Sequence, residues 1–243
     1  MVIQNREHHE TAAYRWVDVM PDEVERLHAV ARGALVVKPS PRGGFVAQVE
    51  LLSSDDADVV RRAVRAAGDS KTSRGIWLSV ASELYEDGML TDAFVRDLIV
   101  DVGGQVDFSF TAFPFDDEGL PTRPDRTSLG TRYGLRVPHL HAEQSALLRD
   151  ELPMGSVELQ SPDEKGAVHA FVNLETDAAC LTAANILAQT PLLSRPTLVA
   201  SLVTVNDNDG IEVDSCVIDL LRRVRCDLQF SYSVVDSGEP DCI

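Results

Sequence analysis

The alternation of apolar and polar residues in the first half of the chain predicts a hairpin followed by a helix. Residues 34–37 form a short apolar run, residues 40–44 have turn chemistry, and residues 45–52 alternate as a half-buried strand does. Asp55 then supplies an N-cap for a helix that has valine and alanine along one face and arginine along the other. Gly68 is expected to end this helix.

A strand, a second helix and a last strand are predicted next. The strand covers residues 75–84, and Asp87-Gly88 closes it as a turn. Apolar residues at helical spacing predict a helix over residues 91–102. Gly103-Gly104 stops this helix, and residues 106–113 alternate as the last strand.

The second half of the sequence repeats the first without a gap when Gly33 is laid on Gly155. Identities continue as far as Ser109 laid on Ser231, which indicates a duplicated domain. A strand and a helix precede each copy, within residues 14–31 and 133–150. The other elements predicted for the second copy are strands at 156–160, 167–174, 197–205 and 226–235 and helices at 177–189 and 213–224.

Each copy therefore has the predicted order βαββαβαβ. This order is typical of an α+β sandwich with a largely antiparallel sheet and helices on one face. Residues 116–125, rich in proline, glycine and charge, cannot extend a strand and are expected to separate the copies. The predicted domains are residues 1–121 and 122–243.

The chain is strongly acidic, with a formal net charge of −17 and a pI near 4.6. This charge argues against binding a nucleic-acid backbone, which requires clustered lysine and arginine. It has two interpretations: adaptation to a salty cytoplasm, or a surface complementary to a basic partner. No apolar run is long enough to span a membrane and no signal peptide is recognised, so a cytoplasmic protein is expected.

The cysteine and histidine residues do not form a recognisable catalytic or metal-binding motif. Cys180, Cys216 and Cys226 fall at apolar positions, where thiols act as small hydrophobic groups, and no histidine neighbours them as a base. His139 and His141 alternate as strand-borne metal ligands would, but the first copy has no equivalent pair. Neither a metal nor a catalytic residue is predicted.

Residues 207–210, Asp-Asn-Asp-Gly, are similar to the start of a calcium loop. Cys216 stands where such a loop needs a bidentate glutamate, and the first copy has Asp87-Gly88 at the same place. We therefore expect a turn shared by the two copies. No phosphate-binding loop, nucleophile elbow or dinucleotide fingerprint occurs, so no cofactor is predicted.

Residues 45–110 resemble a known family. Their order is a strand, a capped helix, a strand opening with Gly75-Ile76-Trp77-Leu78, a helix, and residues 103–107 leading into an aromatic strand. This resembles the regulator of ribonuclease activity B family, small acidic ferredoxin-like domains that bind and inhibit an endoribonuclease. The resemblance implies a ferredoxin-like unit present twice in tandem. The family's Asp-Gly-Trp signature is replaced here by Asp107-Phe108-Ser109, so no binding residues are carried over.

The resemblance and the charge together predict a non-enzymatic regulator or inhibitor that binds a basic protein, such as a ribonuclease. One alternative is an immunity protein against a toxin. Another is an enzyme or small-ligand sensor with a site in a cleft between the copies.

The predicted contact strip joins the last strand of each copy to the turn beside it, where carboxylates would steer a basic partner and aromatic residues would anchor it. It consists of Asp107, Phe113, Phe115, Asp116 and Asp117 in the first copy and Asp227, Tyr232 and Asp236 in the second. The competing interpretation is that the aromatic residues of these strands belong to the core, while the acids keep the sheet edge soluble.

Overall fold

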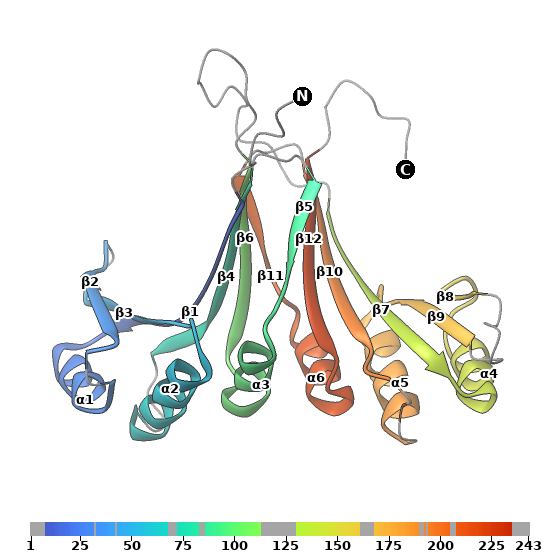
Figure 1. Cartoon of the computed structure of the whole chain (residues 1–243), viewed down its shortest axis with the longest axis horizontal. Coiled ribbons are helices and arrows are strands. Elements are labelled where there is room, and N and C mark those ends of the chain that lie inside the picture. The colour runs from blue at the N-terminus through green and yellow to red at the C-terminus, as the bar shows by residue number, and fades with distance from the viewer. Residues whose placement is uncertain are drawn as a thin grey trace, which may run out of the picture. The chain divides into compact units, whose positions relative to one another are not determined.

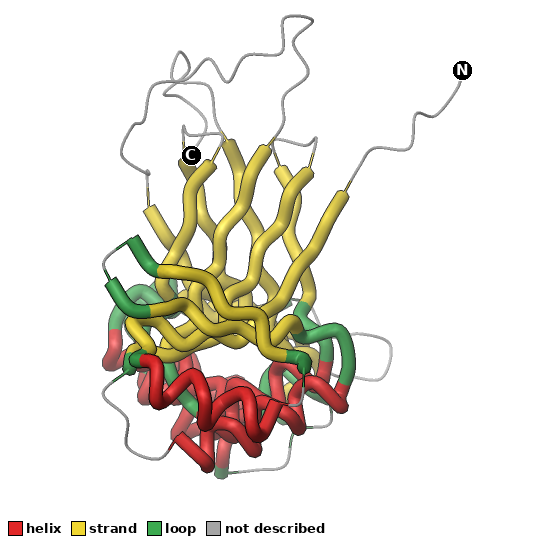
Figure 2. The backbone as a smooth tube through the Cα atoms, turned by 90° about the vertical axis from the view of Figure 1, so that its left-hand side faces the viewer, coloured by secondary structure: helices red, strands yellow, loops and turns green. Residues whose placement is uncertain are grey.

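The computed structural model describes residues 8–31, 33–41, 43–67, 72–82, 86–112, 130–160, 168–189, 192, 194–204 and 208–234. These residues form two compact units, each with a six-stranded sheet (Figure 1). The helices of each unit pack side by side in chain order (Figure 1). They cover one face of the sheet (Figure 2). Strand residues alternate between buried and half-buried, as expected for a sheet that is covered by helices on one face.

The first unit contains a ferredoxin-like core. Strands β4, β1, β3 and β2 lie in that order and pair antiparallel, and with α1 and α2 they make a βαββαβ unit. After α3, strand β6 pairs parallel with β4, and β11 pairs antiparallel with β6. The elements of the unit are β1 (His8–Val19), α1 (Pro21–Ala31), β2 (Leu35–Pro39), β3 (Phe45–Glu50), α2 (Ser54–Ala67), β4 (Ser73–Ser82), α3 (Ala93–Val102), β6 (Gln105–Ala112) and β11 (Asn208–Glu212).

The second unit has the same architecture. Its strand order β5-β12-β10-β7-β9-β8 matches the order β11-β6-β4-β1-β3-β2 position by position, including the single parallel pair. The predicted tandem duplication of an α+β unit is thus confirmed. The elements are β7 (Gly130–Leu140), α4 (Ala142–Glu151), β8 (Val157–Leu159), β9 (Val168–Asn173), α5 (Asp177–Ala188), β10 (Thr197–Thr204), α6 (Ser215–Val224), β12 (Asp227–Val234) and β5 (Glu86–Leu90).

The two halves of the chain exchange one edge strand. Strand β5 belongs to the first half of the sequence but pairs with β12 in the second unit, and β11 belongs to the second half but pairs with β6 in the first unit. The exchange is reciprocal, because Gly88 lies opposite Ser231 and Gly210 lies opposite Ser109. Each unit is therefore assembled from both halves of the sequence.

The exchanged strands correct the predicted order βαββαβαβ, because the expected Asp-Gly turns are strands. Each aspartate accepts a hydrogen bond at 2.8 Å from the N–H of the next residue, Gly88 or Gly210, and such local bonds are typical of turns. Glycine is needed here for close strand approach. A Cβ at Gly210 would lie 2.6 Å from the carbonyl oxygen of Phe108. The observed order in each half is βαββαββαβ.

The equivalence of the two copies shifts by one residue in part of the fold. Val49 pairs with Tyr14 and Leu35, and Val172 pairs with Leu135 and Val157. Val172 is therefore the counterpart of Val49, whereas the ungapped alignment gives Phe171. From β4 to β6 the alignment holds, as the strand registers of the two units agree. Compensating one-residue changes in loops keep the buried face of each strand buried.

The first turn of α2 corrects a second detail. Ser53, and not Asp55, caps this helix: its Oγ accepts from the N–H of Asp56 at 3.4 Å and donates to Asp56 Oδ2 at 2.8 Å. Thr176 caps α5 in the same way, accepting from the N–H of Ala179 at 3.2 Å. The N-terminal cap is thus a hydroxyl in both copies.

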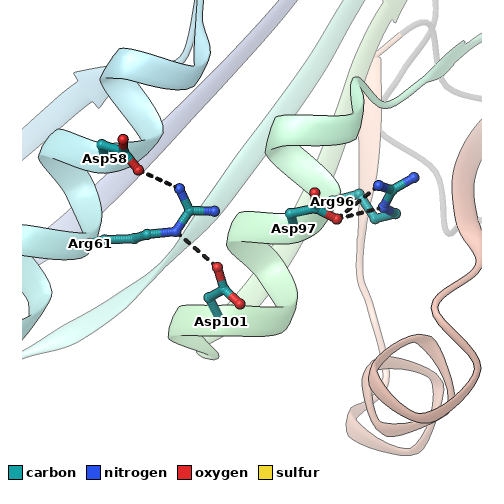
Figure 3. Close-up of polar contacts among 5 residues, drawn as sticks. All are labelled: Asp58, Arg61, Arg96, Asp97 and Asp101. Atoms are coloured by element: carbon teal, nitrogen blue, oxygen red, sulfur yellow. Dashed lines mark hydrogen bonds and ion pairs between the residues drawn. The ribbon is translucent and has the colours of Figure 1, made fainter.

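Ion pairs join neighbouring helices of the first unit. Arg61 on α2 contacts Asp58 Oδ1 at 2.7 Å and Asp101 Oδ2 on α3 at 2.9 Å (Figure 3). In the second unit the arginine is on the other helix of the pair. Arg223 on α6 donates to Asn185 Oδ1 on α5 at 2.9 Å. The same helix contact is therefore made by different chemistry in each unit.

Candidate binding face of the first unit

The structure separates the residues of the predicted contact strip. Asp107 on β6 and Asp227 on β12 are half-buried and alternate with the core residues of their strands, so both lie on the face opposite the helices. Tyr232 is only 2% exposed and lies in the core. The other predicted positions lie outside the described residues; they are Phe113, Phe115, Asp116, Asp117 and Asp236.

Asp107 belongs to a row of side chains that crosses three strands of the first unit. It lies directly opposite Trp77 on β4 and directly opposite Glu212 on β11, so the three side chains share the face opposite the helices. Glu212 comes from the second half of the sequence, and only the strand exchange brings it beside Asp107. Two carboxylates and an aromatic ring are thus lined up across the sheet.

Arg15 on β1 completes this group. Its guanidinium carbon lies 4.3 Å from the centre of the Trp77 ring, within the range of a cation–π contact. Its Nε atom is buried and has no hydrogen-bond partner among the described residues. Burial lowers the pKa of Arg15, and the negative charge of Asp107 opposes that effect. Arg15 therefore has a buried N–H with no acceptor within the described part of the chain.

Asp107 is held in an unfavourable environment for a carboxylate. Burial is the largest effect on the pKa of Asp107 and raises it, and the neighbouring charge of Glu212 raises it further. A hydrogen bond from Gln105 Nε2 at 3.1 Å and the charge of Arg15 act in the opposite direction. The net effect is a raised pKa, so the ionised form of Asp107 would be stabilised by an additional cation.

Arg15, Trp77 and Asp107 line a cavity of about 490 Å³ on the sheet face, and Glu212 is not among its lining residues. Its walls combine apolar groups with a few converging polar ones, the usual character of a binding site. At Gly75, which also lines the cavity, a Cβ would collide with the backbone carbonyl of Gln105. The lining includes two arginines, Arg15 and Arg74, together with Val17, Pro41, Val46, Trp77 and Asp107.

The second unit does not repeat this arrangement. Its row across the equivalent strands is Leu90, Gln229 and Val199, which replaces both carboxylates and the tryptophan by neutral groups. The ring of Phe171 also lies against Gly134, where a Cβ would collide with it. The acidic and aromatic row is therefore specific to the first unit.

The histidines considered as metal ligands have a different environment. His139 has a positive φ of 55° at a bulge of β7, and its ring lies 4.8 Å from that of His169. Among the described residues, no three His, Cys, Asp or Glu side chains converge as metal ligands. No helix in the described part of the chain is long and apolar enough to cross a membrane.

Sequence reasoning found Asp107 but missed Arg15, Trp77 and Glu212 as its neighbours. In the sequence, Trp77 and Arg15 have no feature that distinguishes them from other strand residues. Glu212 follows a segment that was predicted to be a turn. Strand pairing alone brings them together, so no local signal in the sequence could have found them.

The comparisons with known proteins do not assign this chain to a family. No family model matches the chain, and no curated protein matches it. One similar solved structure contains the first two RRM domains of yeast poly(U)-binding protein, at 12% identity, 79% coverage of this chain, 98% coverage of that chain and a TM-score of 0.21. Another is a bacterial light-regulated adenylyl cyclase, at 10% identity, 87% and 79% coverage and a TM-score of 0.21. TM-scores this low have no bearing on the fold or function of this chain.

Proposed function

We propose that this protein is a non-enzymatic regulator that binds a basic protein partner, and that the row of Glu212, Asp107 and Trp77 receives a lysine or arginine side chain of that partner. The observation that carries the proposal is the direct cross-strand pairing of Asp107 with Glu212. Like charges at directly opposite positions of a sheet destabilise it. A partner's cation placed beside the two carboxylates would reduce this repulsion further than the charge of Arg15 already does.

The neighbouring residues suit such a ligand. Trp77 offers an aromatic ring next to the two carboxylates, and aromatic faces attract lysine and arginine. A net charge of −17 would speed the encounter with a basic protein and disfavour acidic ones. A basic ribonuclease or toxin has this chemistry.

The test is quantitative capture of partners by the immobilised full-length protein from an extract of its own cells. The variant is Asp107→Asn with Glu212→Gln. Its matched control is Asp227→Asn with Glu86→Gln, which removes the same two charges from the second unit. We expect one basic protein to be retained by the wild type and the control and to be lost by the variant, with affinity reduced by about tenfold or more, since a hydrogen bond to a charged group is worth about 1.5–3 kcal/mol.

Fluorescence gives an independent readout on the purified pair. The chain has two tryptophans, and Trp16 is 1% exposed, so Trp77 should report the binding of the partner. Trp77→Phe should abolish the fluorescence change and weaken binding, whereas Val199→Ala at the equivalent place in the second unit should not. Equal loss of capture in the charge variant and its control would show that net charge alone matters, and the proposed site would be wrong.

A further inference from the structure

Two cysteines of the second unit lie in contact. Cys216 on α6 donates a thiol hydrogen bond to Cys180 on α5, with 3.5 Å between the sulfur atoms. The two helices pack side by side. A disulfide has a sulfur–sulfur distance of about 2.0 Å, so closing the bond needs the two sulfur atoms to approach by about 1.5 Å.

The duplicated fold does not require these thiols. Counted from the caps Ser53 and Thr176, the residue that matches Cys180 in the first unit is Ala57. Counted from the first residue of α3 and of α6, the match for Cys216 is Phe94. Packing at these two positions is thus achieved without sulfur in the first unit. The cysteine pair is an addition particular to the second.

One of the two thiols is accessible and the other is not. Cys216 is half-buried and lines an open cavity of about 440 Å³ together with Tyr133, Asp177 and Asp214. Cys180 is 1% exposed. A small oxidant entering the cavity therefore reaches Cys216 first and leaves Cys180 as the thiol that can attack it. In accessibility and placement, though not in thiol pKa, this matches a reactive cysteine beside a resolving one.

We propose that Cys180 and Cys216 are a site of reversible oxidation, at which a peroxide converts the two thiols into a disulfide that links α5 to α6. Cys216 sulfur attacks the peroxide, whose O–O bond breaks, and becomes a sulfenic acid with release of one water. Cys180 sulfur then attacks the Cys216 sulfur, the S–S bond forms, and the sulfenic oxygen leaves as a second water. Two electrons pass from the thiols to the peroxide, and an external dithiol returns them.

The environment of Cys216 sets the conditions for this reaction. Burial raises the pKa of its thiol most, and the neighbouring Asp177 raises it further. The thiolate is the reacting form, so the reaction should be slow at neutral pH and accelerate as the pH rises. This pH dependence distinguishes the pair from a cysteine activated for fast peroxide chemistry.

The experiment treats the full-length protein with hydrogen peroxide, blocks the remaining thiols, and maps the peptides without reduction by mass spectrometry. We expect a linked pair of peptides that contain Cys180 and Cys216, lighter by two hydrogens than the separate peptides and restored by dithiothreitol. Cys226→Ser is the matched control, because Cys226 is fully buried, and it should leave the link unchanged. Cys180→Ala, which copies Ala57 of the first unit, should abolish the link.

Two results would overturn the proposal. One is a wild-type protein whose Cys216 ends as sulfinic acid while Cys180 stays reduced. The other is a disulfide that joins either residue to Cys226 or Cys242, or to another molecule. Both are read from the wild-type peptide map, so a variant that fails to fold does not obscure the answer.

Discussion

Replacing Gly210 by valine should release β11 from the first unit. The Cβ would lie 2.6 Å from the carbonyl oxygen of Phe108 and 3.3 Å from the Cα of Ser109. Both neighbours are backbone atoms of the paired strand and cannot move aside as a flexible side chain could. The pairing of Asn208–Glu212 with β6 must therefore open.

The cost follows from what β11 contributes. It makes five register pairs with β6, and each ladder hydrogen bond is worth about 1 kcal/mol. Ile211 is 7% exposed in the folded protein, and leaving it in water costs about 2 kcal/mol. In an antiparallel ladder alternate pairs exchange two hydrogen bonds each, so about four to six bonds are lost. Together with Ile211, this lowers the free energy of unfolding by about 6–8 kcal/mol, a large part of the 5–15 kcal/mol typical of a domain.

Urea unfolding measures this loss, and hydrogen exchange locates it at the amides of residues 208–212. Because Glu212 leaves the face with β11, the pKa of Asp107, followed by carbon-detected NMR, should move back toward its ordinary value. The matched control is Gly88→Val in the second unit, which crowds β12 in the same way but leaves Glu212 beside Asp107. Gly210→Val with wild-type stability and full amide protection at 208–212 would refute the reasoning.

Three further predictions concern single side chains. Arg61→Met should lower the free energy of unfolding by about 1 kcal/mol, since its two aspartate partners are half exposed, and a double-mutant cycle with Asp101→Asn measures the pair. Asp107→Asn should raise stability at neutral pH. The pKa of Asp107 is raised in the folded state, so the stability of the wild type falls as the pH rises through that pKa. Thermal melts of the variant at several pH values should lack this fall. Burial raises the pKa of Tyr133 to about 12, so spectrophotometric titration should lose one late phenol in Tyr133→Phe.

Helix and strand positions were predicted well wherever burial on one face forced a regular pattern. The strand of Ile76, Leu78 and Val80 alternates because one face packs under helices, and α3 shows its apolar spacing for the same reason. The duplication was equally visible, because turn, cap and core residues recur at fixed spacing in both halves. These features depend on local chemistry, so local sequence patterns are sufficient to predict them.

The exchanged strands were missed for a physical reason. A strand of five residues at a sheet edge, with an aspartate bonding its own neighbour and a glycine in the middle, has the same local chemistry as a turn. The glycine is fixed by a backbone carbonyl of β6 or β12, which lies far away in sequence. Local patterns contain no record of that neighbour.

The sequence by itself determined the α+β class, the tandem duplication, most of the helices and strands, and the strong negative charge. Tertiary structure alone decided that Asp107 has Glu212 on one side and Trp77 on the other, because this row depends on a strand supplied by the other half of the chain. It also decided that Cys180 and Cys216 touch, since the contact needs two helices packed side by side. Side-chain neighbours across strands and helices are set by pairing register and packing, and neither is encoded in short stretches of sequence.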